Sequence, residues 1–370
     1  MANKRVCAYI KLENIKKNVD AVKRHLKPST KVLAVVKADA YGHGAVPIAK
    51  YLETAVWGFA VATVSEGVEL RTAGLKKPIL VLGYSFSDEI SDVLKNDLSI
   101  TVFSYKTAFE ISKYASSLRK TVKMHIKLDT GMGRIGFECS DRAIDDIEKI
   151  SRLPAVTIEG IFTHFSKSDE TDRSFTEKQF EKFSRMVESL EERGVDVGLK
   201  HCANSAAIID YPQMQLDMVR LGVALYGMWP SDEVSRDAVN LLPAMSIESH
   251  VTHVKKVPAG TPISYGGTFV TERESIIATV PVGYGDGYAR SLSGKGKVLI
   301  NGEFVPIVGR VCMDQFMIDA TDLNVNVGDR VVLLGKDGDF SITMEDLGRM
   351  SGRFNYEFAC DINQRVPRVY

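Results

Sequence analysis

Apolar and polar residues follow a regular alternation along the first two thirds of the chain. Short apolar runs, typical of buried strands, are separated by longer segments whose apolar residues recur at the spacing of an amphipathic helix. The helices predicted in this way are 45–52, 65–72, 87–96, 105–117, 141–151 and 174–193. The predicted strands are the eight runs 31–38, 58–62, 78–83, 99–103, 122–129, 158–165, 198–204 and 218–227.

Strand–helix alternation of this kind indicates a mostly parallel sheet, because parallel neighbours need a crossover between them. Eight repeats favour a closed (β/α)8 barrel over an open, doubly wound sheet. We therefore expect residues 1–240 to form a barrel. The strand-like segment Val6–Leu12 precedes the first repeat. It either pairs with the C-terminal part of the chain or caps the barrel, and the sequence leaves both possibilities open.

The pattern changes after about residue 240. Asn301-Gly302 between two apolar runs predicts a tight hairpin, and the only clear helix is at 343–350. We expect residues 241–370 to form an all-β C-terminal domain. Its strand-like segments are 246–257, 275–282, 296–300, 305–319 and 330–334.

The composition of the 370 residues argues against several classes of protein. Lysine plus arginine and aspartate plus glutamate are both 47, so the formal net charge is zero. This argues against nucleic acid or an anionic membrane as the partner. The five cysteines are scattered and indicate reduced thiols. Neither a signal peptide nor an apolar stretch of roughly 18 residues is found, so we expect a cytoplasmic protein.

Polar residues cluster where the predicted strands end. Lys37 follows the apolar run Val32–Val36, and its charge there must be solvated, paired or used in chemistry. A lysine amine in such a place can attack a carbonyl group. A barrel enzyme has its site at these strand ends, so the cluster predicts a site for an anionic ligand. Its other members are Asp129–Arg134, Thr163–Ser166, His201–Ser205 and Arg220.

The sequence gives weaker support to two other kinds of site. Gly131–Gly136 has the G-x-G-x-x-G spacing of a dinucleotide site, but it follows the fifth strand and Arg134 would crowd the turn. His250 and His253 lie in a predicted strand, where this spacing places them on opposite faces, so no metal site is expected.

Three loops in the C-terminal part also draw attention. Tyr265 and Tyr284 are flanked by glycines, which is typical of exposed loops that a ligand can approach. The segment Gly309–Asp314 interrupts an apolar stretch and also suggests a functional loop.

Taken together, these segments resemble the alanine racemases, pyridoxal-phosphate enzymes of fold type III. The resemblance covers nearly the whole chain in family order, and it implies a barrel followed by a β domain. The segments that carry it are Val35–Gly44, Lys127–Arg134, His201–Ala206, Arg220–Gly227, Ser264–Thr268 and Gly309–Asp314.

The resemblance implies a set of cofactor contacts. Lys37 would hold pyridoxal 5′-phosphate covalently, and Arg220 would face the ring nitrogen, with His164 and His201 bonded around the guanidinium. Asn204 would also lie at the cofactor. The cofactor phosphate would be held by Tyr41, Ser205, Gly222, Val223 and Tyr356, the glycine and valine through backbone N–H groups.

The resemblance also implies the groups that handle the substrate. Arg134 would bind the substrate carboxylate and the cofactor's phenolic oxygen. Tyr265 and Met313 would come from the second subunit of a head-to-tail homodimer. Lys127 aligns with a lysine that is carbamylated in many family members. The substrate access corridor would contain Asp169, Tyr284, Arg290 and Arg310.

The implied reaction is the racemisation of L- and D-alanine, which supplies D-alanine for bacterial peptidoglycan. It needs two acid/base groups on opposite faces of the α-carbon, and these would be Tyr265 and Lys37, the lysine acting on the D-enantiomer. Arginine cannot give up its proton, so Arg220 would leave the ring nitrogen unprotonated. Amino-acid decarboxylases of the same fold carry an acidic partner there. Non-catalytic cofactor carriers lack the β domain, and a serine or broad-specificity racemase remains a third alternative.

Overall fold

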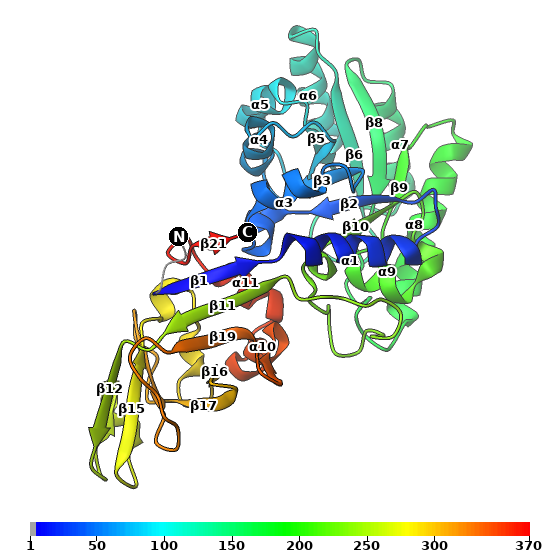
Figure 1. Ribbon diagram of the computed structural model, residues 1–370. Helices are drawn as coiled ribbons and strands as arrows, with labels where there is room; N and C mark the ends of the chain where they lie inside the picture. The colour runs from blue at the N-terminus through cyan, green and yellow to red at the C-terminus, as the bar shows by residue number, and fades with distance from the viewer. Residues whose placement is uncertain (1–4) are drawn as a thin grey trace. The chain divides into compact units, whose positions relative to one another are not determined.

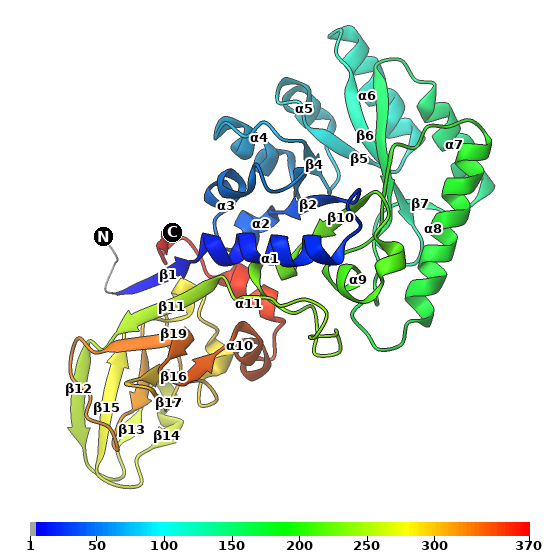
Figure 2. The same ribbon diagram turned by 45° about the vertical axis from the view of Figure 1, so that its right-hand side comes forward.

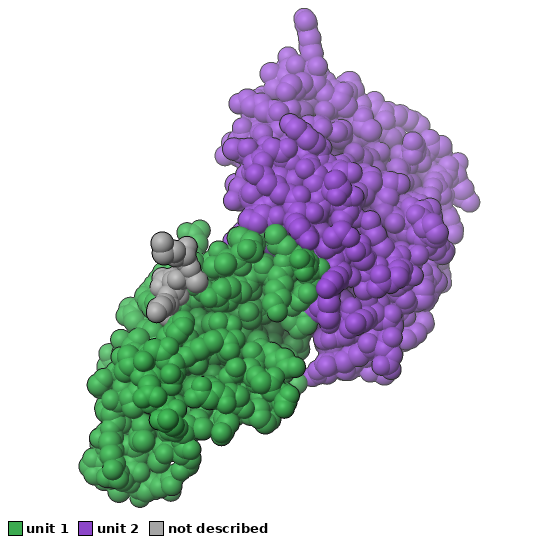
Figure 3. Space-filling model, in the orientation of Figure 1, with its two compact units in different colours: residues 1–14, 41–44, 243–370 green, residues 15–40, 45–242 purple. Residues whose placement is uncertain are grey.

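The computed structural model describes residues 5–370, which form two compact units (Figure 3). The barrel unit comprises residues 15–40 and 45–242. The β unit comprises residues 41–44 and 243–370 together with the described part of residues 1–14.

Eight parallel strands form the centre of the barrel unit, with helices outside them (Figures 1 and 2). Neighbours in the chain pair in order from β2 to β9, and β10 pairs back onto β2. The ring closes between β9 and β10 through two backbone hydrogen bonds, from Arg220 N–H to Ala203 O at 3.0 Å and from Asp217 N–H to Lys200 O at 3.2 Å. The predicted barrel is therefore confirmed.

The barrel strands agree with the apolar runs of the sequence. β3 is buried at every position, as expected for a parallel strand covered on both faces. The short β7 (Phe137–Glu138) pairs with β6 outside the ring. The eight ring strands are β2 Lys31–Val35, β3 Gly58–Val61, β4 Ile79–Val81, β5 Ser99–Val102, β6 Val122–Asp129, β8 Val156–Phe162, β9 Leu199–His201 and β10 Met218–Leu221.

The helices begin where side-chain oxygens can satisfy their first N–H groups. Ser104 and Ser140 cap α6 and α7, and Thr63 forms a capping box with Glu66 at the start of α4. The helices are α1 Leu12–His25, α2 Lys37–Tyr41, α3 Ala45–Leu52, α4 Val64–Thr72, α5 Ile90–Lys95, α6 Tyr105–Ser117, α7 Asp141–Ser151, α8 Ser174–Glu192 and α9 Ser205–Asp210. Shorter 3₁₀ turns are η1 Ser87–Glu89, η2 Pro212–Met214 and η3 Val223–Tyr226.

The β unit is built on a mostly antiparallel sheet with the order β12-β15-β18-β17-β16-β19-β11-β1-β21, and β20 pairs with β19. The strands are β1 Val6–Ile10, β11 Met245–His250, β12 His253–Val257, β13 Pro262–Ile263, β14 Phe269–Val270, β15 Ser275–Val280, β16 Lys297–Ile300, β17 Glu303–Val308, β18 Phe316–Asp319, β19 Arg330–Asp337, β20 Phe340–Ile342 and β21 Arg368–Val369. The helical segments are α10 Met344–Ser351, α11 Asn355–Asp361 and the turns η4 Tyr265–Gly267, η5 Tyr284–Asp286 and η6 Arg290–Leu292.

Several details of the β unit test the sequence patterns. Asn301 and Gly302, with φ of 53° and 77°, join β16 and β17 in the predicted hairpin. β1 pairs antiparallel with β11, which answers the open question about the opening strand.

Three expectations about the β unit were wrong. The run 246–257 is two strands, because β11 pairs with β1 and β19 while β12 pairs with β15. The run 305–319 is also two strands, β17 and β18, which pair with each other. The helix at 343–350 is not the only one, since α11 follows it. With seven residues, α11 is too short to give a clear periodic signal.

Two features of residues 5–370 bear on membrane and metal binding. None of the helices there has both the length and the apolar character that a bilayer crossing requires. In the same part of the chain, histidine, cysteine, aspartate and glutamate side chains do not gather in groups of three or more that could hold a metal ion.

Asn18 on α1 binds the backbone of Leu242, the last residue of the barrel unit, and this contact can be tested by mutation. Its fully buried amide donates to Leu225 O and Leu242 O and accepts from Leu242 N–H. Asn18→Ala leaves these groups without partners and should lower the free energy of unfolding by about 2–3 kcal/mol. Asn14→Ala, which removes one exposed bond to Pro243 O, should cost about 0.5 kcal/mol in the same urea titration. Equal losses would contradict this account.

Candidate active site

A left-handed turn follows Lys37 at the end of β2. The next three residues have φ of 52°, 51° and 54°, a conformation that costs each L-residue about 1–2 kcal/mol. Two carboxylates hold the turn: Glu66 accepts the N–H of Ala38 at 2.7 Å, and Asp39 accepts the N–H of Ala45 at 2.7 Å. Since Glu66 also belongs to the capping box of α4, the position of Lys37 is tied to the neighbouring helix.

Arg220 on β10 is the most extensively bonded side chain of the barrel interior and is 4% exposed. Its Nη1 donates to Nδ1 and the carbonyl of His201 at 3.0 and 3.1 Å. Its Nη2 donates to Thr163 O, Cys202 O and His164 Nδ1 at 2.8, 2.9 and 3.1 Å. No described residue accepts from its Nε–H. Burial lowers the pKa of Arg220 to about 10, so the guanidinium stays charged at neutral pH.

The two histidines bonded to Arg220 are held neutral. Burial, followed by repulsion from Arg220, places the pKa of His164 and of His201 well below the usual value. Because a guanidinium only donates, each Nδ1 must accept, and we assign the ring proton to Nε2 in both histidines.

A backbone cradle lies where β10 ends. Ser205 Oγ accepts the N–H groups of Gly222 and Ala224 at 3.0 and 3.3 Å, which leaves the hydroxyl proton available as a donor. The turn η3 starts at Val223, and its first N–H groups have no partner within the turn. Asn204 caps α9 through its side-chain oxygen. Such a set of donors suits a phosphate group.

Lys127 is 2% exposed, with its Nζ 2.6 Å from Leu128 O and 5.4 Å from the centre of the Phe162 ring. Burial, followed by repulsion from Arg220, lowers the pKa of Lys127 to about 7. Arg134 is exposed, and its positive charge also lowers the pKa of Lys127. The amine of Lys127 is therefore partly neutral, and hence nucleophilic, near pH 7.

The backbone N–H groups at the start of the G-x-G-x-x-G segment bind the side chain of Asp129, which precedes it. Asp129 Oδ1 accepts the N–H groups of Gly131, Met132 and Gly133 at 3.0, 2.9 and 3.1 Å. Burial opposes ionisation, but these bonds give Asp129 a lowered pKa. The N–H groups that a pyrophosphate would need are thus already used. The loop presents Arg134 instead, so the dinucleotide interpretation is not supported.

The C-terminal site residues lie together on loops of the β unit. Tyr265, Met313 and Tyr284 are 70%, 53% and 42% exposed. Tyr284 N–H donates to Cys312 O at 3.0 Å, and Gly285 N–H donates to Met313 O at 2.8 Å. The loop of Tyr284 and the loop of Met313 are therefore fastened to each other.

The Tyr265 loop is fastened to the same group. Ser264 Oγ donates to Arg310 O at 2.8 Å, and Ser264 itself has φ of 67°. Gly309 has φ of 69°, and a Cβ there would lie 2.7 Å from Ile263 O. These contacts place Tyr265 and Arg310 on neighbouring loops.

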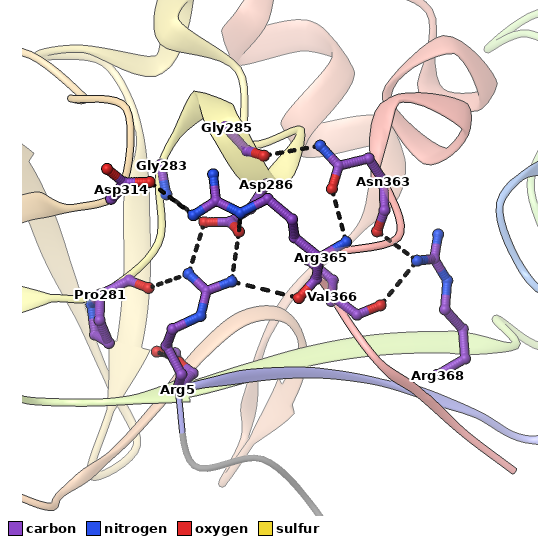
Figure 4. A network of polar contacts seen from close by, with 11 residues as sticks. Arg5, Pro281, Gly283, Gly285, Asp286, Asp314, Asn363, Arg365, Val366 and Arg368 are labelled. Atoms are coloured by element: carbon purple, nitrogen blue, oxygen red, sulfur yellow. Dashed lines mark hydrogen bonds and ion pairs between the residues drawn. The ribbon is translucent and has the colours of Figure 1, made fainter.

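Asp286 lies beneath these loops, between two arginines (Figure 4). Its side chain is 1% exposed and receives bonds from Arg5 Nη1 at 3.0 Å and from Gly283 N–H at 3.1 Å. Arg365 Nε lies 3.4 Å from Asp286, while its Nη2 donates to Asp314 at 2.7 Å. Arg365 thus links the turn of Tyr284 to the residue after Met313.

The remaining predicted residues are placed as follows. Tyr41 and Tyr356 lie close together in the β unit, where burial raises the pKa of Tyr41, followed by contributions from Cys360 and Tyr356. Arg290 starts η6 and is exposed. Asp169, in the barrel unit, is half-buried, and burial raises its pKa.

The sequence patterns did not identify four residues that hold the site residues or their loops in place. Glu66 had a signal, because Thr63-x-x-Glu66 is a capping box. Asp286 lies in the glycine-rich Tyr284 segment, but burial between arginines has no local signature. His125 and Glu159 are polar residues inside apolar strands, a signal that only acquires meaning once their partners are known.

A barrel with a lysine at the carboxyl end of its first strand is the arrangement of barrel enzymes that act through a lysine amine. The profile "Alanine racemase, N-terminal domain" matches residues 10–230, and "Alanine racemase, C-terminal domain" matches 244–370. The chain therefore belongs to the alanine racemase family.

Individual relatives and solved structures point to the same family. The alanine racemase of Methanococcus maripaludis is 48% identical, with full coverage of both chains. The structure of the Clostridium difficile 630 alanine racemase has a TM-score of 0.95 at 42% identity and covers 100% of this chain and 96% of that one. The Bacillus anthracis alanine racemase with bound L-Ala-P has a TM-score of 0.94 at 39% identity, with 100% and 95% covered.

The arginine-flanked carboxylate gives a prediction for the β unit. Asp286→Asn replaces a buried acceptor oxygen by an NH2 donor among arginine and N–H donors, and it should lower the free energy of unfolding by about 1.5–3 kcal/mol. Asp314→Asn removes a half-exposed partner of Arg365 and should cost less than about 1 kcal/mol. Urea unfolding followed by circular dichroism compares the two. A small loss for Asp286→Asn would show that the network contributes little.

Proposed function

We propose that the protein interconverts L- and D-alanine with pyridoxal 5′-phosphate as cofactor. The observation that carries the proposal is the arrangement of Arg220. Both of its Nη atoms are used by the protein, while its Nε–H is left without an acceptor in the described chain. A neutral ring nitrogen is an acceptor suited to that donor.

The residues present fit this cofactor. The Ser205 hydroxyl and the Val223 N–H would donate to a phosphate. Gly222, whose N–H donates to Ser205 Oγ, is proposed to complete that site together with Tyr41 and Tyr356. Lys37 would hold the aldehyde carbon. When bound, the cofactor supplies a carbonyl that links to the amino acid and a ring that stabilises negative charge at the α-carbon.

The chain's own residues would then bind the substrate and move its proton. Arg134 pairs with the substrate carboxylate. Lys37 takes the α-proton of D-alanine on one face, and Tyr265 serves the other face for L-alanine. Tyr265 and Met313 would belong to the second subunit of a homodimer, a role supported by their exposure in the single chain. Their side chains would leave room only for a small substituent.

The same arginine argues against an amino-acid decarboxylase as the alternative function. A decarboxylase of this fold benefits from a carboxylate that protonates the ring nitrogen, whereas Arg220 is held as a donor by five bonds. We further propose a cytoplasmic location and a role in supplying D-alanine for peptidoglycan. Asp169, Tyr284, Arg290 and Arg310 are proposed to line the access corridor.

The decisive assay uses purified protein with the cofactor and either enantiomer of alanine. We expect optical rotation to decay to zero from both directions. Protein that binds the cofactor but leaves both enantiomers unchanged would point to a carrier. Release of carbon dioxide would point to a decarboxylase.

Arg220→Glu tests why an arginine faces the ring. A carboxylate would keep the ring nitrogen protonated and stabilise charge at the α-carbon for longer, which favours transfer of the amino group. We expect kcat for racemisation to fall by about tenfold or more, equivalent to about 1.4 kcal/mol. We also expect pyruvate to form up to one equivalent per bound cofactor, because the amino group stays on the cofactor. Pyruvate is measured with lactate dehydrogenase. Unchanged pyruvate formation and racemisation would sink this explanation.

Tyr265→Ala tests both the second base and the substrate pocket. Loss of the phenol should reduce alanine racemisation by about 100-fold or more, and the space released should raise the relative activity on larger amino acids. Initial rates with alanine and leucine, followed by chiral chromatography, measure both effects. A variant that keeps full activity on alanine would remove Tyr265 from the reaction.

Lys127 is proposed to carry a carbamate that would pair with Arg134. The neutral amine bonds to the carbon of CO2 and loses a proton, and the electron pair moves to oxygen. Because only the neutral amine reacts and the pKa is about 7, the carbamate should increase as pH rises through 7. Carbon-13 NMR with labelled bicarbonate should show one signal that is absent in Lys127→Met. The same signal in both proteins would contradict the assignment.

A further inference from the structure

A chain of hydrogen bonds runs from Arg220 across the barrel interior to a carboxylate. Arg220 Nη1 donates to His201 Nδ1 at 3.0 Å, and His201 Nε2 lies 2.9 Å from His125 Nδ1. His125 Nε2 lies 3.2 Å from Glu159 Oε2, which also accepts from Ser99 Oγ. These residues come from β10, β9, β6, β8 and β5, so the chain crosses the ring of strands.

The two ends of this chain fix its direction. Arg220 can only donate, so His201 Nδ1 accepts and its Nε2–H donates to His125. A carboxylate can only accept, so His125 Nε2–H donates to Glu159. Both ends demand the same neutral Nε2–H tautomer in both rings. A second proton on either ring would turn one N–H toward another donor.

Burial makes the hydrogen bonds between these side chains costly to break. His201 and His125 are 0% and 1% exposed, so an N–H that lost its acceptor would cost about 1–3 kcal/mol. Burial raises the pKa of Glu159, but hydrogen bonds from His125 and Ser99 outweigh it and leave that pKa lowered. Glu159 is therefore ionised at neutral pH, and its charge polarises each successive bond toward Arg220.

We propose that Glu159, acting through His125 and His201, is a positioning residue for Arg220. Its carboxylate accepts the last proton of the chain, which makes His201 Nδ1 a stronger acceptor and holds the guanidinium with its Nε–H free for a ligand. A carboxylate behind a metal-bound histidine fixes the ring in the same way. The inference rests on the proposed function in one respect, that Arg220 faces the cofactor ring.

The test compares Glu159→Leu with Glu148→Leu. Glu148 on α7 is a matched control, because its side chain is 22% exposed against 21% for Glu159 and it also accepts a hydrogen bond from a basic side chain. Nitrogen-15 NMR of histidine-labelled, cofactor-loaded protein reports the ring tautomers. We expect Nε2–H tautomers of His201 and His125 in the wild type.

In Glu159→Leu the His201 ring resonances should shift, and kcat for alanine should fall about tenfold with little change in KM. Glu148→Leu should do neither. Unchanged His201 resonances and kcat in Glu159→Leu, or a wild-type His201 protonated at Nδ1, would overturn the inference. If Glu159→Leu does not fold, Glu159→Gln keeps an acceptor but removes the charge. It should shift the same resonances by less, and no shift would again overturn the proposal.

Absence of racemisation in the wild type would remove the proposed function, while the NMR result still decides the role of Glu159.

Discussion

The buried guanidinium of Arg220 is the constraint on which the barrel interior depends. A charge that is 4% exposed must be surrounded by acceptors, and the barrel supplies them as carbonyl groups where β8 and β9 end and as two histidine rings. Those rings must in turn be neutral and in one tautomer. The charge therefore organises the strands around it, and it leaves a single directed donor for a ligand.

The same logic explains how each unit presents its groups. In the barrel unit, Glu66 and Asp39 use their carboxylates to hold an unfavourable left-handed turn next to Lys37. In the β unit, Asp286 and Arg365 fasten the loops that expose Tyr284 and Met313 (Figure 4). In each unit, buried or partly buried carboxylates therefore position the loops that carry the proposed catalytic groups.

Much of this was accessible from the sequence. Apolar periodicity predicted all eight barrel strands, since a strand buried on both faces leaves a continuous apolar run, and Asn301-Gly302 predicted its hairpin by turn chemistry alone. The site residues were proposed from strand ends and motif resemblance. The supports were not accessible. His125 and Glu159 are 34 positions apart, and Asp286 meets Arg5 across 281, so their pairing depends on tertiary packing that no local pattern encodes.

The central claim is that two different side chains move the α-proton on opposite faces of alanine. Deuterium incorporation tests it most directly, with Tyr265→Ala loaded with the cofactor and supplied with L- or D-alanine in heavy water. The account predicts that D-alanine still exchanges its α-proton through Lys37, while exchange from L-alanine is lost. Equal exchange from both enantiomers at the wild-type rate would contradict it.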